Sequence, residues 1–482
     1  MSASREKKIR QERMSSGYVD PKQTKAQQEK AKERRTTRIY TALIALFLLG
    51  AAALLVWNSN VIQSRADALK VDGETYSAAD ASYYYRNAYN SFMSQNGSLA
   101  SYLFDQTKSL RDQENPYGEG TWFDFFVEQA AHNIASSRAL NAAASEAGFD
   151  PGTAVDDALA NAWSSLKESA ASNGMSVTQY LKAIYGPLVN KQVFERNFRT
   201  LALADAYTDA YVDSLSYTAD EIQSVYDADP NSYSSADMEY IRFLVEADSD
   251  ATDEEKAELL EQAKANAEAA LERYQNGESL IAIAKDMDVT YNHTAAMANG
   301  SSELQEWAFD GARVDGDAAV LPYSTDAGYS VAIFHGKSRN DYHPVSVRHI
   351  LVDSEDKANE LLAQWQAGAA TEESFAALAA ENSTDGGSSS NGGLYTDISR
   401  GQMVEAFDNW CFDPARRNGD TGIVKTDYGY HVMYFVDASD TPYWQTQVVN
   451  ALKSAAYQEW YNGIVGDDEP EVEQLSGLKY VN

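Results

Sequence analysis

Cysteine is almost absent from the sequence, where Cys411 is the only one. A single thiol cannot form an intramolecular disulfide, and it cannot build a cysteine-based metal cluster. No cysteine follows the apolar segment near the N-terminus, where a lipoprotein requires one. An internal repeat described below has Ala308 at the matching position, so we expect Cys411 to be a buried packing residue and not a nucleophile.

Positive charge is scarce over most of the chain. The formal net charge is −33 at pH 7, and because residues 1–38 carry +7, the remainder carries −40. So acidic a surface repels nucleic acid, which excludes a DNA- or RNA-binding role and favours solubility. No glycine-rich phosphate loop precedes a predicted helix, so neither a nucleotide nor any other cofactor is expected.

Only one stretch is long and free of charge, residues 39–57. At a rise of about 1.5 Å per residue, it is just long enough to cross a hydrocarbon core of about 30 Å. Three arginines in residues 34–38 precede it, so the positive-inside rule places the basic tail 1–38 in the cytoplasm. We therefore expect a single-pass cell-membrane protein whose region from residue 58 onward is extracytoplasmic.

A cleaved signal peptide is the alternative interpretation of this segment. The triplet Ala66-Asp67-Ala68 resembles a cleavage site. However, the apolar run of residues 39–57 exceeds the roughly 7–15 residues usual for the core of a signal peptide, and the basic segment before it is long. An uncleaved anchor is therefore favoured.

Apolar periodicity divides the outer region into a helical part and a mixed part. In residues 58–235, apolar residues recur at three- and four-residue spacing, which predicts a helical domain, with the aromatic cluster Trp122–Phe126 either in its core or lining a groove for unfolded chains. From residue 236, strand-like runs alternate with charged helices. The residues after Gly466 are acidic and are expected to be loose. The predicted helices cover residues 78–95, 121–147, 154–171, 187–214, 218–228, 252–275 and 443–463.

Two blocks of about 100 residues in the mixed part are related, which indicates a duplicated domain. Residues 307–317 match 410–420, residues 324–331 match 425–432, and residues 241–245 match 348–352. A tryptophan, a phenylalanine and a Gly-Asp turn occur in both blocks, so they are expected to shape the fold.

The two blocks differ at two histidines. His349 corresponds to Arg242, and His431 corresponds to Ser330. Because only the second block has both histidines, any chemistry that depends on them belongs to the second block.

The second block contains a series of recognisable short motifs, at residues 347–352, 375–379, 382–385, 392–394, 401–407, 422–426 and 429–432. With these motifs it resembles a parvulin domain over residues 343–438. The resemblance implies a four-stranded antiparallel sheet with surrounding helices. The first block, 236–340, is similar to a degenerate parvulin, and 58–235 more weakly resembles the helical chaperone domain of the SurA/PrsA-like foldases, which residues 440–482 would complete.

The resemblance also implies site residues. The two histidines would face each other across the sheet, beside a polar residue that meets the substrate and an apolar pocket that holds the proline ring. No third ligand of suitable spacing accompanies the histidines, so no metal is expected. The implied catalytic residues are His349, Asp385, Thr426 and His431, and the implied substrate-binding residues are Met403, Phe407 and Leu394.

These residue types suit the isomerisation of X-Pro bonds. Rotation about an ordinary peptide bond faces a barrier of about 18–20 kcal/mol, but no covalent bond has to break. An apolar pocket that grips proline, with polar groups that bind the twisted amide better than the planar one, lowers that barrier. The resemblance therefore implies a peptidyl-prolyl cis-trans isomerase and chaperone for unfolded or partly folded exported proteins.

A non-catalytic holdase with inactive parvulin domains is the alternative function. Relatives usually read Gly-Gly-Asp-Leu-Gly where this chain has Gly392-Gly393-Leu394-Tyr395. This departure favours the alternative, whereas the intact pair of histidines favours the enzyme.

Overall fold

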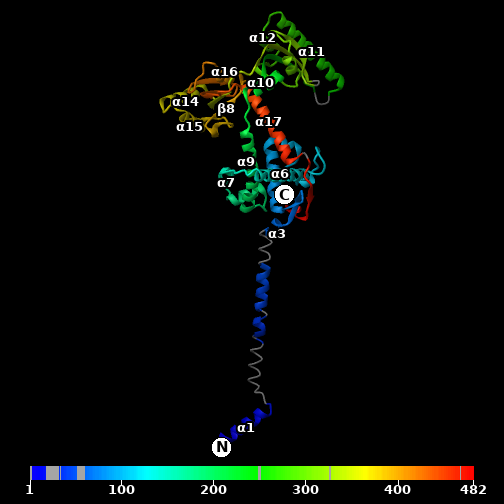
Figure 1. Ribbon diagram of the computed structural model, residues 1–482, viewed down its shortest axis with the longest axis vertical. Helices are drawn as coiled ribbons and strands as arrows, with labels where there is room; N and C mark the ends of the chain where they lie inside the picture. The colour runs from blue at the N-terminus through cyan, green and yellow to red at the C-terminus, as the bar shows by residue number, and fades with distance from the viewer. Residues whose placement is uncertain are drawn as a thin grey trace. The chain divides into compact units, whose positions relative to one another are not determined.

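The structure is a computed structural model. It describes residues 3–17, 32, 34–38, 40–51, 60–247, 251–324, 327–466 and 468–482. Within these residues, helices are combined with three antiparallel sheets, and the chain divides into two compact units, residues 1–214 with 458–482, and residues 215–457 (Figure 1).

The predicted membrane span lies partly outside the described residues, since residues 39 and 52–57 are not among them. Within the described part of the chain, no helix combines the length and the apolar character that crossing a membrane requires.

The first unit is built mainly from helices, as the periodicity predicts. Thr121 and Ser176 begin two of them with capping boxes, in which the side chain three residues later bonds back to the cap. The helices of this unit beyond the N-terminal segment are α3 (Val61–Ser64), α4 (Ala78–Asn96), α5 (Ala100–Leu103), α6 (Trp122–Glu146), α7 (Ala154–Ser172), α8 (Val177–Tyr185) and α9 (Lys191–Ser214).

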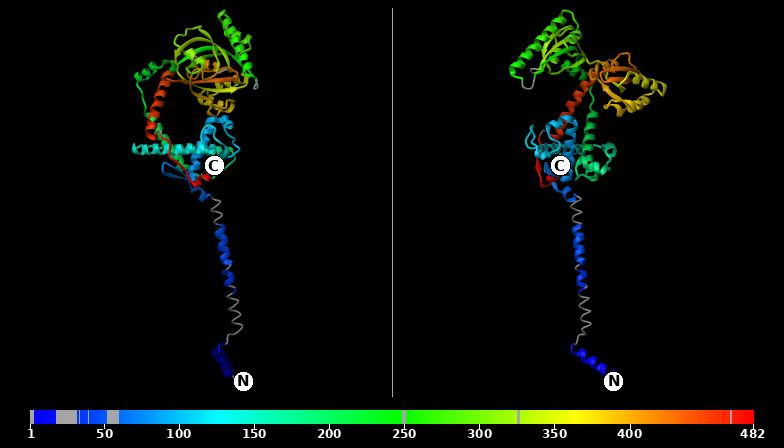
Figure 2. Two further views of the ribbon diagram at one scale, coloured as in Figure 1. Left: turned by 90° about the vertical axis from the view of Figure 1, so that its right-hand side faces the viewer. Right: turned by 180° about the vertical axis from the view of Figure 1, so that it is seen from behind.

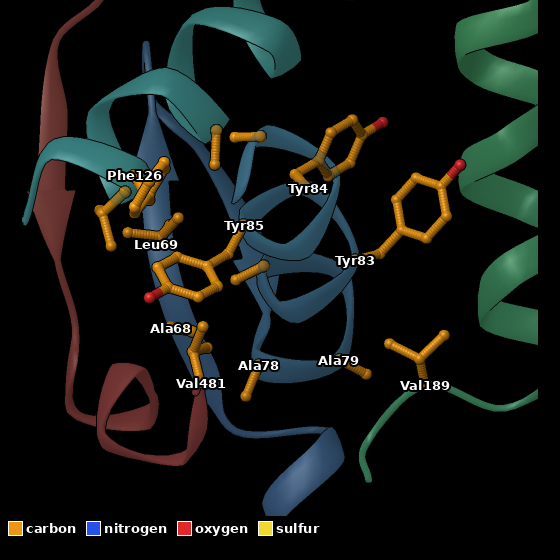
Figure 3. Packing of buried hydrophobic residues seen from close by; sticks show 14 of the residues in the cluster. Ala68, Leu69, Ala78, Ala79, Tyr83, Tyr84, Tyr85, Phe126, Val189 and Val481 are labelled. Atoms are coloured by element: carbon orange, nitrogen blue, oxygen red, sulfur yellow. The ribbon is translucent and has the colours of Figure 1, made fainter. Parts of the chain in front are cut away.

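Three consecutive tyrosines of α4 anchor the core of this unit. Tyr83, Tyr84 and Tyr85 are each at most 3% exposed, and they leave the helix in different directions (Figure 3). Tyr83 stacks on Tyr185 with ring centroids 5.1 Å apart, while Tyr85 meets Phe126 edge-on at 6.1 Å. The helix is therefore buried on several sides.

A small sheet in this unit corrects the prediction that residues 58–235 are helical. Strands β1 (Asp67–Val71) and β2 (Glu74–Ser77) form a hairpin, and β11 (Val472–Gln474) pairs with β1. The turn residues Asp72 and Gly73 both have positive φ, as an Asp-Gly hairpin turn requires. The periodicity argument overlooked this dipeptide.

The residues after Gly466 are not loose in the structure. Leu478 and Val481 are buried against the core of the first unit. The Arg111 guanidinium donates hydrogen bonds to both of their carbonyl oxygens, at 2.8 and 2.9 Å. The acidic composition of this segment concealed these apolar residues.

The second unit contains two sheets with the same strand order. Residues 236–340 hold the first and are called the first sheet domain; residues 343–438 hold the second and are called the second sheet domain. One has the order β4-β3-β6-β5, and the other has β8-β7-β10-β9. Their strands are β3 (Ser234–Leu244), β4 (Tyr291–Ala298), β5 (Ala318–Pro322), β6 (Gly328–Arg339), β7 (Val345–Val352), β8 (Leu394–Ile398), β9 (Thr421–Thr426) and β10 (Gly429–Ala438).

Helices cover these sheets in the same sequence order. Helix α11 lies along the first sheet (Figure 2), where its buried alanines pack on Ile241 and Ile333. In the second sheet domain, α14 and α15 bury Trp365 and Phe375 in the same way. The helices are α10 (Ala219–Ala228), α11 (Asp253–Gln275), α12 (Leu280–Asp286), α13 (Glu303–Phe309), α14 (Glu355–Ala367), α15 (Glu372–Asn382) and α16 (Glu405–Cys411).

The last long helix, α17 (Tyr443–Val465), carries the predicted apolar stripe. In the second unit, Trp444 meets Tyr226 at 5.2 Å. In the first unit, Trp460 stacks on Tyr211 at 4.3 Å. The stripe therefore packs on partner aromatic residues at both of its ends.

Side-chain contacts repeat between the two sheet domains. The Arg313 guanidinium stacks on Trp307 at 4.3 Å and donates to its carbonyl oxygen at 2.9 Å. Arg416 makes the same two contacts with Trp410, at 4.1 and 2.9 Å. Such a pair of contacts fixes the turn after the short helix in each domain.

Strand register corrects two details of the repeat. Arg242 pairs with Ser330 and Tyr240 with Ala332, whereas Leu351 pairs with His431 and His349 with Met433, so Tyr240 and not Arg242 takes the position of His349. Leu321 pairs with Ser330, and Val424 pairs with His431, although the sequence match aligns Ser324 with Lys425. The turn between the last two strands is thus two residues longer in the first domain.

Candidate active site

His349 and His431 lie on the two central strands of the second sheet, β7 and β10. Their Nδ1 atoms are 3.0 Å apart, and their rings are stacked with centroids 5.2 Å apart. Only 3% of His349 and 6% of His431 is exposed. The structure thus brings the two predicted histidines into direct contact in a buried position.

Polar side chains continue this pair at both ends. His349 Nε2 lies 3.0 Å from an oxygen of Asp385 and 3.0 Å from Ser388 Oγ. Tyr395 donates its hydroxyl to the same Asp385 oxygen at 3.0 Å. At the other end, Thr426 Oγ1 is 2.8 Å from His431 Nε2.

The carboxylate fixes the direction of every hydrogen bond in this chain of groups. Ionised Asp385 only accepts, so His349 carries its proton on Nε2. The Nδ1 of neutral His349 must then accept from Nδ1–H of His431, whose Nε2 in turn accepts the hydroxyl proton of Thr426. The amide of Tyr428 donates to that hydroxyl oxygen at 3.1 Å. Both tautomers follow from these requirements.

Burial keeps both histidines neutral. Burial, with the neighbouring His349, lowers the pKa of His431 from its usual 6.5 to about 4. Burial also lowers the pKa of His349, although its bond to Asp385 acts in the opposite direction. Burial alone would raise the pKa of Asp385, but its hydrogen bonds, from Ser388 above all, lower it to about 2. The network is therefore a neutral pair next to a fixed negative charge.

An apolar edge borders the histidines. The Phe407 ring meets both imidazoles edge-on, at 5.5 Å from His349 and 5.4 Å from His431, and it is 2% exposed. Met403 packs in the same apolar cluster and remains partly exposed. Phe407 thus packs against both histidines, while Met403 keeps part of its side chain exposed at this apolar edge.

Leu394 is placed differently from the other predicted site residues. It precedes Tyr395 on β8, and Tyr395 faces His349 at 5.4 Å. Neighbouring side chains of a strand point to opposite faces, so Leu394 lies on the far face of the sheet from the histidines.

Sequence reasoning missed Ser388 and Tyr395. Ser388 is fully buried, in a Gly/Ser-rich stretch that reads as an ordinary loop. Tyr395 belongs to the tetrapeptide that departs from the usual parvulin pattern, and its hydroxyl reaches Asp385. The departure marked this loop as unusual, but nothing in it identified Tyr395 as the residue that bonds Asp385.

Cys411 takes no part in this network. It is 1% exposed, and burial raises the pKa of its thiol to about 12. A neutral, enclosed thiol is a poor nucleophile, as the sequence comparison predicts.

A family model described as "Rotamase: PPIC-type PPIASE domain" matches residues 347–437. These residues are a parvulin-type domain.

Curated relatives match over the same part of the chain. Foldase protein PrsA 1 of Listeria innocua is 37% identical over 113 residues, which cover 23% of this chain and 36% of that protein. A parvulin-like PPIase of Rickettsia bellii is 39% identical over 101 residues, 20% of this chain and 34% of that protein. The chain thus spans about a third of the length of the curated relatives it matches. The crystal structure of PrsA from Bacillus subtilis aligns over 74% of this chain and 93% of that chain, at 15% identity and a TM-score of 0.29.

Acid is expected to destabilise the parvulin domain between pH 6.5 and pH 4. Unfolded His431 takes up a proton near pH 6.5, whereas in the folded protein its pKa is about 4. The unfolded state therefore binds more protons in this window, and the free energy of unfolding falls by on the order of 3 kcal/mol as the pH drops through it. Below pH 4, protonation of Asp385 adds to the loss, because its pKa is about 2 when folded and 3.8 otherwise.

Hydrogen exchange at the amides of β7 and β10, corrected for intrinsic rates, measures this free energy at pH 7 and pH 5. In His431→Gln, the slope against pH should become shallower. An unchanged slope in this variant would show that other groups set the acid response.

Proposed function

We propose that the chain is a membrane-anchored foldase that isomerises X-Pro bonds in unfolded or partly folded exported proteins, with no cofactor. The observation that carries the proposal is the buried, neutral pair of His349 and His431, held between Asp385 and Thr426. The rotamase match of residues 347–437 supports it.

Isomerisation of an X-Pro bond breaks no covalent bond, so the site has to position the substrate and needs no nucleophile. The proline ring would rest on the exposed part of Met403 beside Phe407, which supplies binding through burial of apolar surface. The fixed charge of Asp385 and the oriented imidazoles would favour the twisted amide over the planar one. Tyr395 would replace the polar partner that the altered loop lacks.

The remaining domains follow from the same proposal. Residues 343–438 would be the active parvulin domain, and residues 236–340 a degenerate copy that lacks both histidines. The shared strand order and the repeated Arg–Trp contacts support the duplication. Residues 58–235, completed by 440–482, would serve as the chaperone-like domain.

We expect the isolated fragment 343–438 to accelerate cis/trans exchange of a proline peptide, and the fragment 236–340 to have no effect. Met403→Ala should raise KM about tenfold with little change in kcat, because it removes apolar contact made equally with substrate and transition state. Exchange spectroscopy on one peptide measures both fragments under one condition. Equal rates from the two fragments, or no activity from folded 343–438, would reject the proposal in favour of the holdase.

The membrane anchor is part of the proposal. Residues 40–51 are helical, and the large apolar side chains between Tyr40 and Leu49 are 55–75% exposed, as suits a segment whose solvent is lipid. Ala68 is fully buried within β1, so cleavage after it would cut a strand. These features support an uncleaved span, and the three arginines in residues 34–38 favour an outside position for the later residues.

Protease added to intact, wall-stripped cells should digest residues 58–482 and leave the basic tail. A tail of residues 1–38 that is digested while the rest is protected would reverse the proposed topology.

A further inference from the structure

The first sheet domain has a cavity of about 670 Å³ where β5 and β6 meet the start of α13. Its walls combine apolar side chains, including Leu260, Leu304 and Pro322, with the hydroxyl-bearing residues Ser302 and Ser330. The cavity is thus large enough for a side chain with the peptide backbone that carries it.

Arg242 supplies a cation to this cavity. Its guanidinium lies over the ring of Tyr240 at 4.6 Å and over the ring of Tyr323 at 4.4 Å. Its Nε is buried without a hydrogen-bond partner, and across the described residues Arg242 makes no ion pair. A buried donor left unpaired is costly, so a ligand that accepts from it gains that energy.

Other arginines stacked on aromatic rings in the second unit are satisfied. Arg313 and Arg416 each donate to a tryptophan carbonyl oxygen, and Arg339 donates to the carboxylate of Asp341 at 2.8 Å. Stacking alone therefore does not explain the unpaired donor of Arg242.

The cation lies beside the positions at which the second sheet domain has its two histidines. Arg242 pairs with Ser330, whereas His431, the counterpart of Ser330, pairs with Leu351. Arg242 therefore takes the position of Leu351, and Tyr240, on which it stacks, takes the position of His349. The strand register places Tyr323 where the second domain has Thr426. The substitutions thus exchange a closed, neutral network for an open cationic one.

The chemistry of the guanidinium selects the ligand. Its planar fork of donors matches the two oxygens of a carboxylate, and pairing in a partly buried site is stronger than in water. Glu303, which also lines the cavity, is exposed and forms no ion pair with Arg242. No described residue thus supplies the acceptor, and another molecule can bring it.

We propose that the first sheet domain is a binding site for peptide carboxylates, recognised by Arg242. The site goes beyond the isomerase reaction, and it rests on the proposed function only in taking the ligand to be a client peptide. The carboxylate comes from an Asp or Glu side chain or from a free C-terminus, which share the same chemistry.

Fluorescence polarisation on the full-length chain distinguishes these sources. Three labelled, N-acetylated hexapeptides without proline are compared: one with a central Glu and an amidated C-terminus, one with Gln in its place, and the Gln peptide with a free C-terminal carboxylate. At least one carboxylate peptide should bind about tenfold more tightly than the uncharged Gln peptide, as expected for a charge-assisted pair. The preferred peptide identifies the source.

The preference should disappear in Arg242→Met and be partly retained in Arg242→Lys, which keeps the charge but not the fork. Lys285→Met, at an exposed position of α12, removes the same charge from the same domain and should change nothing. Equal binding of all three peptides by the wild-type chain would overturn the proposal. So would a preference that survives in Arg242→Met, or one that inorganic phosphate abolishes at concentrations comparable to the peptide.

Proline-peptide exchange measured on the same samples separates the two proposals. It should be unaffected by Arg242→Met. Hydrogen exchange at the amides of β3 and β6 shows whether the first sheet domain of this variant is folded; if it is not, a preference that is weaker in folded Arg242→Lys than in the wild type supports the proposal, and an undiminished one overturns it. A wild-type chain that prefers carboxylates but fails to isomerise would overturn the isomerase and leave the carboxylate site standing.

Discussion

His349→Ala is expected to abolish isomerisation and to lower the free energy of unfolding of the parvulin domain by about 3–5 kcal/mol. The substitution removes the bonds of His349 to His431, Asp385 and Ser388. It leaves the Nδ1–H of His431 buried without an acceptor and opens a cavity beside Phe407. Exchange spectroscopy and hydrogen exchange of β7 and β10 measure the two losses on one preparation.

His335→Ala provides the matched control in the first sheet domain. His335 also pairs with a carboxylate, that of Glu239 at 3.1 Å, but its side chain is 33% exposed, so its removal should cost little. If His349→Ala kept both the wild-type stability and the wild-type exchange rate, the network would have no part in either property.

Gly393→Ala is expected to have an effect of similar size without removing any chemical group. Gly393 has a φ of +72°, and a Cβ there would overlap the carbonyl oxygen of His349. Its own carbonyl oxygen accepts the amide of His349 at 2.8 Å, so the strain would be transmitted directly to the histidine. A positive φ together with overpacking should cost about 2–4 kcal/mol and most of the activity.

Gly386→Ala is the matched control, because it makes the same glycine-to-alanine change in the same loop but away from His349. Gly386 is exposed, and a Cβ there would meet no atom within 4 Å. Its stability and exchange rate should match those of the wild type. Equal effects of the two substitutions, measured by thermal melting and proline-peptide exchange, would mean that close approach to His349 is unimportant.

The long helices could be predicted from the sequence because their signal is local. The helices expected at residues 78–95, 121–147 and 154–171 appear as α4, α6 and α7 with ends shifted by at most one residue. Periodic apolar residues and capping residues all lie within the segment itself, so no distant partner is needed to recognise them.

The small sheet of the first unit could not be predicted in full, for the opposite reason. The hairpin of β1 and β2 had a local signal in Asp72-Gly73, but β11 is only three residues long. Its conformation depends on pairing with β1 and on the burial of Leu478, which no local pattern reveals.

In the candidate site, too, residues with a recognisable motif could be predicted, and residues whose position depends on distant contacts could not. The resemblance pointed to four polar residues, and the structure joins them by hydrogen bonds in the order Asp385, His349, His431 and Thr426. Tyr395 could not be inferred, because its role depends on the path of the loop and not on its residue type. Leu394 was predicted as a site residue from its motif, but its side chain lies on the opposite face of the sheet from the histidines.

The pairing of β1 with β11 has a consequence for the order in which the protein folds. Lys70 and Glu473, which meet across these strands, are 403 residues apart in the chain. A chain that emerges N-terminus first exposes the tyrosine-rich α4 long before residues 472–481 arrive to cover the core. The second unit, by contrast, is one continuous stretch, residues 215–457. We therefore expect the parvulin domain to be folded while the first unit is still unfinished, so that the first unfolded polypeptide it meets is its own.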